Sequence, residues 1–149
     1  MEGNRKEIRI RPARQEDLRS VEKLLIASGL PPDGIDEHLS SMLIAKRENK
    51  VVATAGLEIY GDSALLRSVV VDPTERGGGL GQRITREAVK MAINLSVNRL
   101  FLLTETAERF FPKLGFQIVD RAVIPATVKS SLEFTSLCPD TALAMELKL

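Results

Sequence analysis

A run of glycines follows an apolar, β-branched segment and precedes a long amphipathic pattern. Residues 69–71 are valines, Pro73 ends that segment, and four glycines fall within 77–81. A glycine cluster at the start of a helix exposes backbone N–H groups at the positive end of the helix dipole. Because such groups bind anions, this stretch is the first candidate for chemistry in the chain.

The spacing of these glycines excludes two common phosphate sites. A Walker A loop needs G-x-x-x-x-G-K-[ST], but its second glycine, counted from Gly77, would fall on Gln82. The dinucleotide pattern G-x-G-x-x-G fails at the same residue. The spacing that remains is R-x-x-G-x-G over residues 76–81.

A carboxylate and a guanidinium lie in an otherwise apolar pair of predicted strands. If Gly61 and Asp62 form a two-residue turn, Glu58 pairs with Leu65, which places Glu58 and Arg67 diagonally on one face. A slip of one residue would separate them onto opposite faces. On one face, the two charges form either part of an active site or a structural salt bridge, and the pattern leaves both open.

The elements that must position these residues follow from hydrophobic periodicity. Strands are predicted over 8–11, where Pro12 stops the alternation, and over 42–46, 51–59, 64–71, 100–103, 116–119 and 143–147. Helices are predicted over 17–28, 35–41, 80–95, 107–114 and 126–134. The helix over 80–95 carries one apolar stripe, at positions 80, 84, 88, 91 and 95. The alternation predicts an α/β (α+β) fold in which helices flank a mixed, mostly antiparallel sheet.

Length and composition bound the class of protein. The 149 residues suit one domain, 1–149, and the formal net charge of +1 argues against a nucleic-acid or membrane-surface partner. No apolar run has membrane-spanning length. A single cysteine, Cys138, and the lack of a secretory signal favour the cytoplasm. The single histidine, His38, argues against a metal site.

Two motifs resemble the landmarks of the GNAT acetyltransferase superfamily. The R-x-x-G-x-G loop, preceded by Val-Asp-Pro, resembles the family's [QR]-x-x-G-x-[GA] pyrophosphate loop, and residues 110–116 resemble its F-Y-x-x-x-G-F block. The resemblance covers nearly the whole chain in the right order. It implies the GNAT fold, acetyl-CoA as cosubstrate, no metal, and direct attack by an amine in a ternary complex. Cys138 is then expected to be a buried apolar residue rather than a nucleophile.

The resemblance also implies which residues bind acetyl-CoA. The backbone of 69–71 should lie beside the pantetheine arm, where a backbone N–H could act as oxyanion donor, and the loop should hold the diphosphate. The implied cofactor-binding residues are Val69, Val70, Val71, Arg76, Gly77, Gly78, Gly79, Leu80, Gly81, Gln82 and Phe111.

Two positions depart from the family pattern. Phe111 stands where the family usually has a tyrosine whose hydroxyl can protonate the leaving thiolate. Because thiols ionise near pH 8.5, the thiolate can leave without a dedicated acid, or water or a nearby hydroxyl can serve. Gly78 stands where the loop often carries a basic residue, which puts the affinity for the cofactor in question.

A narrower resemblance concerns the acceptor. Residues 64–68, 102–104, 110–111, 119–121 and 136–139 resemble the arsenic-resistance N-acetyltransferases. The stretch from Leu100 to Pro125 is similar to the transferase domain of N-acetylglutamate synthase. Both imply that the acceptor is the α-amine of a small amino acid or analogue, such as glutamate, arsinothricin or phosphinothricin. Since the family is often dimeric, a homodimer is also an expectation.

Glu58 and Arg67 are the leading candidates for the acceptor site. In this interpretation Glu58 is the catalytic base, acting through water, and Arg67 binds the acceptor's acid group. The adjacent guanidinium would lower the pKa of Glu58, which favours a water relay or a role as ammonium anchor. Tyr60 could replace the hydroxyl missing at Phe111, although simple packing is the alternative.

The remaining substrate-binding candidates are Ser68, Thr104 and Arg121, with Lys113 as a further cation. Thr104 could instead cap the following helix, and Arg121 and Lys113 could simply be solvated. His38 is expected to be exposed on a helix. Two other functions remain open: a non-catalytic acyl-CoA-binding module, and acetylation of a protein or polyamine. A polyamine acceptor would predict an acidic pocket rather than arginines.

Overall fold

The computed structural model describes residues 7–131 and 142–149. Two compact units are formed by these residues. The first comprises residues 7–56 and 68–88, and the second comprises 57–67 with the described residues from 89 onward. The two units are described in turn.

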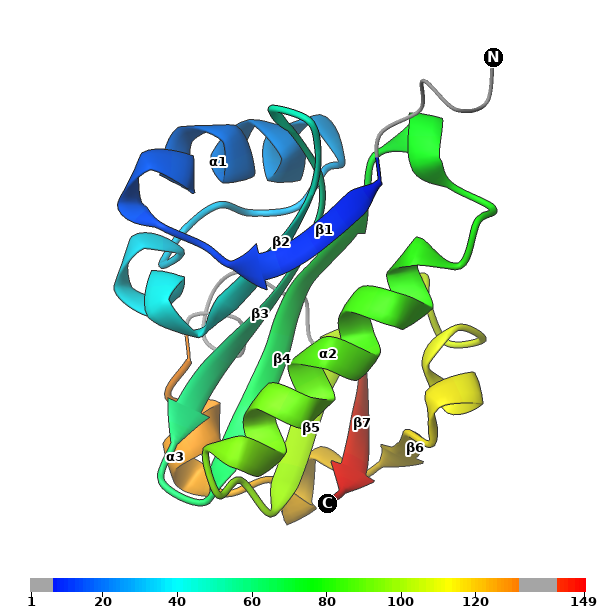
Figure 1. The fold of residues 1–149 in the computed structure, drawn as a ribbon. Coiled ribbons are helices and arrows are strands. Elements are labelled where there is room, and N and C mark those ends of the chain that lie inside the picture. The colour runs from blue at the N-terminus through cyan, green and yellow to red at the C-terminus, as the bar shows by residue number, and fades with distance from the viewer. Residues whose placement is uncertain (1–6, 132–141) are drawn as a thin grey trace. The chain divides into compact units, whose positions relative to one another are not determined.

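The strands and helices follow the predicted order (Figure 1). The strands are β1 (Ile8–Pro12), β2 (Met42–Arg47), β3 (Lys50–Tyr60), β4 (Ser63–Val71), β5 (Arg99–Thr104), β6 (Gln117–Val119) and β7 (Leu143–Lys148). The α-helices are α1 (Leu18–Ala27), α2 (Leu80–Asn94) and α3 (Ala126–Lys129). The strand order is β1-β2-β3-β4-β5-β7-β6, with β4–β5 parallel and β1–β2, β2–β3, β5–β7 and β6–β7 antiparallel. The mixed, mostly antiparallel sheet of the α/β prediction is confirmed.

The core of the first unit lies between α1 and the neighbouring strands. Val21, Leu24 and Leu25 recur at helical spacing, so they fall on one face of α1. That face packs against Ile44 of β2 and Val51 of β3. Figure 1 shows α1 in blue alongside these strands.

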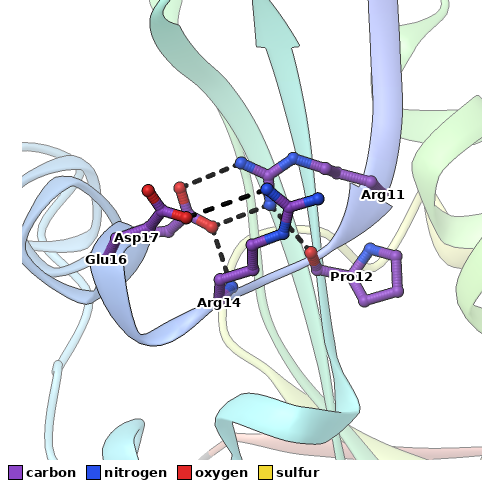
Figure 2. A network of polar contacts seen from close by, with 5 residues as sticks. All are labelled: Arg11, Pro12, Arg14, Glu16 and Asp17. Atoms are coloured by element: carbon purple, nitrogen blue, oxygen red, sulfur yellow. Dashed lines mark hydrogen bonds and ion pairs between the residues drawn. The ribbon is translucent and has the colours of Figure 1, made fainter.

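A polar network joins the end of β1 to the start of α1 (Figure 2). Arg11 donates two hydrogen bonds to Asp17, at 2.8 Å and 3.1 Å, and the backbone N–H of Arg14 donates to the same carboxylate at 2.8 Å. The hydrogen bond from Arg11 holds the pKa of Asp17 below its ordinary value despite burial. The network therefore fixes the turn between the strand and the helix.

In the second unit, β7 lies between β5 and β6, and its residues help to form the core. Leu65, Phe101 and Ala144 pack together with Ile124 and Val128. Beside them, Arg99 of β5 donates to Glu146 of β7 at 2.7 Å and 3.1 Å, and its guanidinium lies 4.8 Å from the ring centre of Phe101. The two hydrogen bonds join β5 to β7 diagonally, since the backbone ladder places Glu146 opposite Phe101, whereas the contact between Arg99 and Phe101 lies within β5.

The helix predicted over 107–114 is confirmed only in its second half and only as a 3-10 helix. The structure has turns there, followed by a short 3-10 helix at Phe111–Leu114 that ends at Gly115 with φ 98°. Pro112 lacks an N–H group. The hydroxyl oxygen of Thr104 accepts a hydrogen bond from the N–H of Ala107 at 2.9 Å. Both features draw the backbone away from continuous α-helical bonding.

The end of α2 also differs from the predicted stripe. Leu95 is 48% exposed, because the helix ends at Asn94 and the chain reverses at Ser96 with φ 64°. The N–H of Val97 then bonds back to the carbonyl of Ala92 at 3.0 Å, and Val97 is buried. Through this Schellman-like helix end, Val97 takes the buried position that the apolar stripe predicts for Leu95.

The predicted helix over 126–134 is confirmed for Ala126–Lys129 and is wrong for Ser130 and Ser131, which follow it as a turn and a bend. Residues 132–134 of this prediction lie outside the described part. Among the helices of the described residues, none has the length and apolar character needed to cross a membrane.

Candidate active site

The glycine loop connects the end of β4 to the start of α2. A 3-10 turn at Pro73–Glu75 precedes it, and the chain then passes through Gly77 with φ 89° and Gly79 with φ 81°. Both values lie in the left-handed region, which glycine adopts without the steric cost of a Cβ. The first hydrogen bond of α2 runs from the N–H of Arg83 to the carbonyl of Gly79, at 3.0 Å. The N–H groups of the preceding turn therefore have no partner within the helix, which is the arrangement an anion can use.

The surface of this loop is open. Arg76 and the three glycines that follow it are exposed, and a Cβ placed on Gly77 or Gly79 would meet no described atom within 4 Å. The Nε of Arg76 donates to the carbonyl of Val71 at 3.2 Å, so this side chain lies along the end of β4. A diphosphate can approach the loop backbone without displacing a side chain.

The other predicted cofactor-binding residues are less exposed. Val70 and Leu80 are buried in the first unit, and Val69 and Val71 are half-buried. Gly81 and Gln82 are half-buried on the first turn of α2.

Ion pairs that the sequence analysis missed hold the loop on its N-terminal side. The carboxylate of Glu75 accepts from Nε and from Nη2 of Arg47, at 2.9 Å each. Asp72 lies 3.4 Å from Lys50 and accepts from the N–H and the hydroxyl of Thr74. No local pattern signals the first pair, because its members stand 28 residues apart.

Glu58 and Arg67 form a buried ion pair in the second unit. The β3–β4 hairpin turns at Gly61-Asp62, as predicted, and Nη1 of Arg67 donates to Oε2 of Glu58 at 2.7 Å. Only 1% of Glu58 and 5% of Arg67 is exposed. The prediction that the two residues share a face is confirmed.

Two hydroxyl groups complete this cluster. Tyr60 and Ser131 each donate to Oε1 of Glu58 at 2.6 Å. Simple packing is therefore an incomplete description of Tyr60. Ser131 was missed because it stands 73 residues from Glu58 along the chain.

The hydrogen bonds set the charge of the cluster. Burial alone would raise the pKa of Glu58, but the donors Ser131, Tyr60 and Arg67 outweigh it and hold that pKa below its ordinary value. Burial and the hydrogen bond to Glu58 raise the pKa of Tyr60 to about 12. At neutral pH Glu58 is thus a carboxylate and Tyr60 a neutral phenol. The lowered pKa makes Glu58 a weak proton acceptor, and the raised pKa makes Tyr60 a weak proton donor.

Phe111 lies in an aromatic cluster of the second unit. Its ring meets Phe110 at a centroid distance of 5.0 Å and Phe116 at 5.6 Å, both in edge-to-face geometry. The side chain is buried, at 6% exposure. Its position is therefore fixed by packing.

The predicted substrate-binding residues Ser68, Thr104 and Arg121 form hydrogen bonds within the protein. Ser68 is buried with φ 57°, and its carbonyl accepts from the hydroxyl of Thr54 at 2.6 Å. Thr104 makes the turn-capping contact described above, and Nη2 of Arg121 donates to the carbonyl of Ala142 at 2.8 Å. Lys113 is exposed.

His38 is half-buried on the 3-10 helix Asp36–Ser41, which corrects the prediction that it is exposed. Cys138 and the motif residues 136–139 lie outside the described residues. In the ranges 7–131 and 142–149, no three His, Cys, Asp or Glu side chains are grouped so as to hold a metal ion.

Comparison with known families identifies the class. A model of the acetyltransferase (GNAT) domain matches residues 38–118, more than half of the chain. The protein belongs to the GNAT acetyltransferase family.

Relatives with assigned names are amino-acid acetyltransferases. One from Pasteurella multocida is 27% identical over 76% of this chain, which corresponds to 26% of that protein. Another from Mycobacterium tuberculosis is 34% identical over 53% of this chain and 45% of the relative. The chain thus spans about a quarter to a half of the length of these two proteins.

Solved structures share the fold. N-acetylglutamate synthase from Neisseria gonorrhoeae, solved with coenzyme A and N-acetyl-glutamate, gives a TM-score of 0.83 at 20% identity and covers 96% of this chain and 35% of that one. A Mycobacterium tuberculosis protein solved with CoA gives 0.79 at 25% identity and covers 95% and 99% of the two chains.

Proposed function

We propose that this protein transfers an acetyl group from acetyl-CoA to the α-amine of a small amino acid or amino-acid analogue. The observation that carries the proposal is the open glycine loop at the start of α2, in a chain of the GNAT family. Both the solved GNAT-fold neighbours described above were crystallised with coenzyme A.

The loop would hold the diphosphate of acetyl-CoA. The N–H groups of the first turn of α2 supply hydrogen bonds and the positive end of the helix dipole, and glycine keeps the backbone accessible. The backbone of 69–71 would lie beside the pantetheine arm and supply an oxyanion donor. The thioester would supply the acyl carbon: the neutral amine nitrogen attacks it, the C–N bond forms and the C–S bond breaks. The nitrogen then releases one proton to water, and solvent protonates the thiolate.

For Glu58, we propose a role as a positioning residue rather than a direct base. The carboxylate already accepts from Arg67, Tyr60 and Ser131, and its pKa is lowered. A proton added to it would weaken those three contacts. The acceptor's ammonium would then lose its proton to water, and Glu58 would fix the guanidinium of Arg67.

Arg67 gives the acceptor site its expected charge preference. Its buried guanidinium suits a carboxylate-bearing substrate better than a cationic one. The names of the relatives point the same way. A glutamate-like acceptor, with arsinothricin and phosphinothricin as analogues, is therefore the proposed substrate class, and Ser68, Thr104 and Arg121 remain secondary candidates.

A panel assay tests the proposal. The protein is incubated with acetyl-CoA and either glutamate, arsinothricin, phosphinothricin or spermidine, and free CoA is measured with a thiol reagent. Release that depends on an anionic amino acid is expected. Release with spermidine alone would replace the proposal by a polyamine acceptor.

Substitution of Arg67 tests the acceptor contact. Arg67→Met should raise KM for anionic acceptors and leave KM for acetyl-CoA unchanged. Because this change strands the Glu58 carboxylate, the variant Glu58→Gln/Arg67→Met serves as the control for folding. An equal rise of both KM values would mean that Arg67 is structural.

The burial of Phe111 favours one alternative, a non-catalytic acyl-CoA-binding module. The family's usual acid is replaced by a packed ring. Calorimetry separates the two functions, since tight CoA binding without turnover of any amine would support the module.

We also propose that the chain forms a single domain. A single domain over 1–149 is supported by the family match, whose residues 38–118 include parts of both units. The homodimer and the cytoplasmic location stay predictions.

A further inference from the structure

The turn that leads into the glycine loop is held by one hairpin tip. Arg47 ends β2 and Lys50 begins β3, and the two residues pair across a two-residue turn. Each of them contacts one acidic residue beside the loop. Residues 47–50 are called the hairpin tip below.

The stronger of the two contacts is the pair between Arg47 and Glu75. Both hydrogen bonds measure 2.9 Å, and together they form the fork geometry that restricts rotation of both groups. The side chain of Glu75 is only 10% exposed and that of Arg47 21%. The hydrogen bond to Glu75 raises the pKa of Arg47, so this guanidinium keeps its charge.

The second contact lies at the other end of the same turn. Lys50 stands 3.4 Å from Asp72, whose carboxylate also holds Thr74. The N–H of Asp72 donates to the carbonyl of Val52 at 2.8 Å. Both ends of Pro73–Glu75 are therefore attached to β2 and β3, directly before Arg76.

We propose that the hairpin tip positions the glycine loop before the diphosphate binds, with Arg47 and Glu75 as the principal fastening. The ligand named here rests on the proposed function. Glycine loses more backbone freedom on ordering than any other residue, so a loop with four glycines is costly to order on binding. A fixed point at Glu75, two residues before Gly77, reduces that cost in advance.

The test compares two matched ion pairs of the same unit. Arg47→Gln and Glu75→Gln break the fastening, and Arg11→Gln breaks the other bidentate pair, whose exposed fractions of 26% and 6% are similar. The measurements are amide hydrogen exchange over residues 74–81 in the ligand-free protein and the Kd for CoA by calorimetry.

In Arg47→Gln and in Glu75→Gln, the amides of residues 74–81 should exchange faster than in wild type. Each of these variants should raise the Kd for CoA by about tenfold. Arg11→Gln should change neither quantity. The variant with both substitutions should bind CoA less weakly than the sum of the two single effects predicts, because the substitutions break the same ion pair.

Two results would overturn the inference. One is loop exchange in Arg47→Gln that equals exchange in Arg11→Gln. The other is tighter CoA binding by Glu75→Gln than by wild type. That result would mean that the negative charge of Glu75 repels the phosphates and that its role in ordering the loop is minor. If wild type fails to bind CoA, the proposed function fails, whereas hydrogen exchange still decides whether residues 47 and 75 order the loop.

Discussion

At the scale of single residues, Glu58 is the centre of a buried polar cluster of the second unit. Three donors hold its carboxylate, and they come from β3, β4 and the residue that follows the turn after α3. Removing one partner of a buried charged pair leaves the other charge uncompensated, which costs about 3–5 kcal/mol. Loss of one member should therefore destabilise the fold, whatever part the cluster plays in catalysis.

The acid stability of the protein should depend on Glu58. Its pKa is lower in the folded state than the ordinary value of 4.5. The carboxylate's contribution to the free energy of unfolding is therefore complete above that value and is lost as the pH falls through the folded-state pKa. The stability difference between wild type and Glu58→Gln should therefore shrink as the pH falls below 4.5. Urea unfolding at several pH values measures it, and a constant difference would contradict the assignment.

The same lowered pKa predicts the pH dependence of catalysis. Because Glu58 stays ionised, the profile of kcat/KM should rise with deprotonation of the substrate amine and show no inflection from Glu58 between about pH 5 and 8. Wild type and Glu58→Gln should give profiles of the same shape. A lost acidic limb in the variant would instead identify Glu58 as the base.

Phe111 offers a second test at this scale. Phe111→Tyr restores the hydroxyl that the family usually has there. If thiolate departure needs no acid, kcat should change by less than about threefold. Burial of the hydroxyl should lower stability by about 1–3 kcal/mol. A tenfold or larger gain in kcat, measured at saturating acetyl-CoA, would show that leaving-group protonation limits the reaction.

At the scale of elements, the glycine loop combines two different uses of glycine. Gly77 and Gly79 have positive φ, whereas Gly78 lies outside that region. A Cβ on Gly78 would meet only the carbonyl oxygen of Glu75, at 3.9 Å. Backbone conformation thus favours glycine at positions 77 and 79 but not at position 78.

This difference predicts the effect of alanine. Gly79→Ala should lower the free energy of unfolding by about 1–2 kcal/mol, because alanine is strained at φ 81°. Gly78→Ala is the matched control and should change it by less than about 0.5 kcal/mol. Urea unfolding of the two variants checks this, and equal losses would contradict the assignment of positive φ as the reason for glycine at position 79.

At the scale of the whole molecule, the open question is whether the two units unfold together. The family match includes parts of both units, which supports one domain. Binding stabilises a two-state domain in proportion to the logarithm of ligand concentration.

Calorimetry tests the single domain. One transition is expected, and CoA at about 100 times its Kd should move all of it upward by roughly 5–10 °C. Two transitions of which CoA moves only one would contradict a single domain.

The order of the elements and the loop were predictable from local patterns. Alternation along 8–11, the mainly apolar run along 64–71 and helical spacing along 80–95 depend on near neighbours, as does the glycine spacing. The Glu58–Arg67 pair was predictable for the same reason, since a two-residue turn sets the register of its hairpin. The partly confirmed helix over 107–114 shows the limit of local patterns: one side-chain bond from Thr104 and one proline outweigh the apolar spacing.

The sequence by itself thus determined the fold class, the family landmarks and the residues on one face of the hairpin. Only the tertiary structure decided which distant groups join them: Ser131 on Glu58, and Arg47 on Glu75. The physical reason is that hydroxyl groups and charges are common along the chain. Their partners are selected by packing across 28 or 73 residues, a separation at which no periodicity survives.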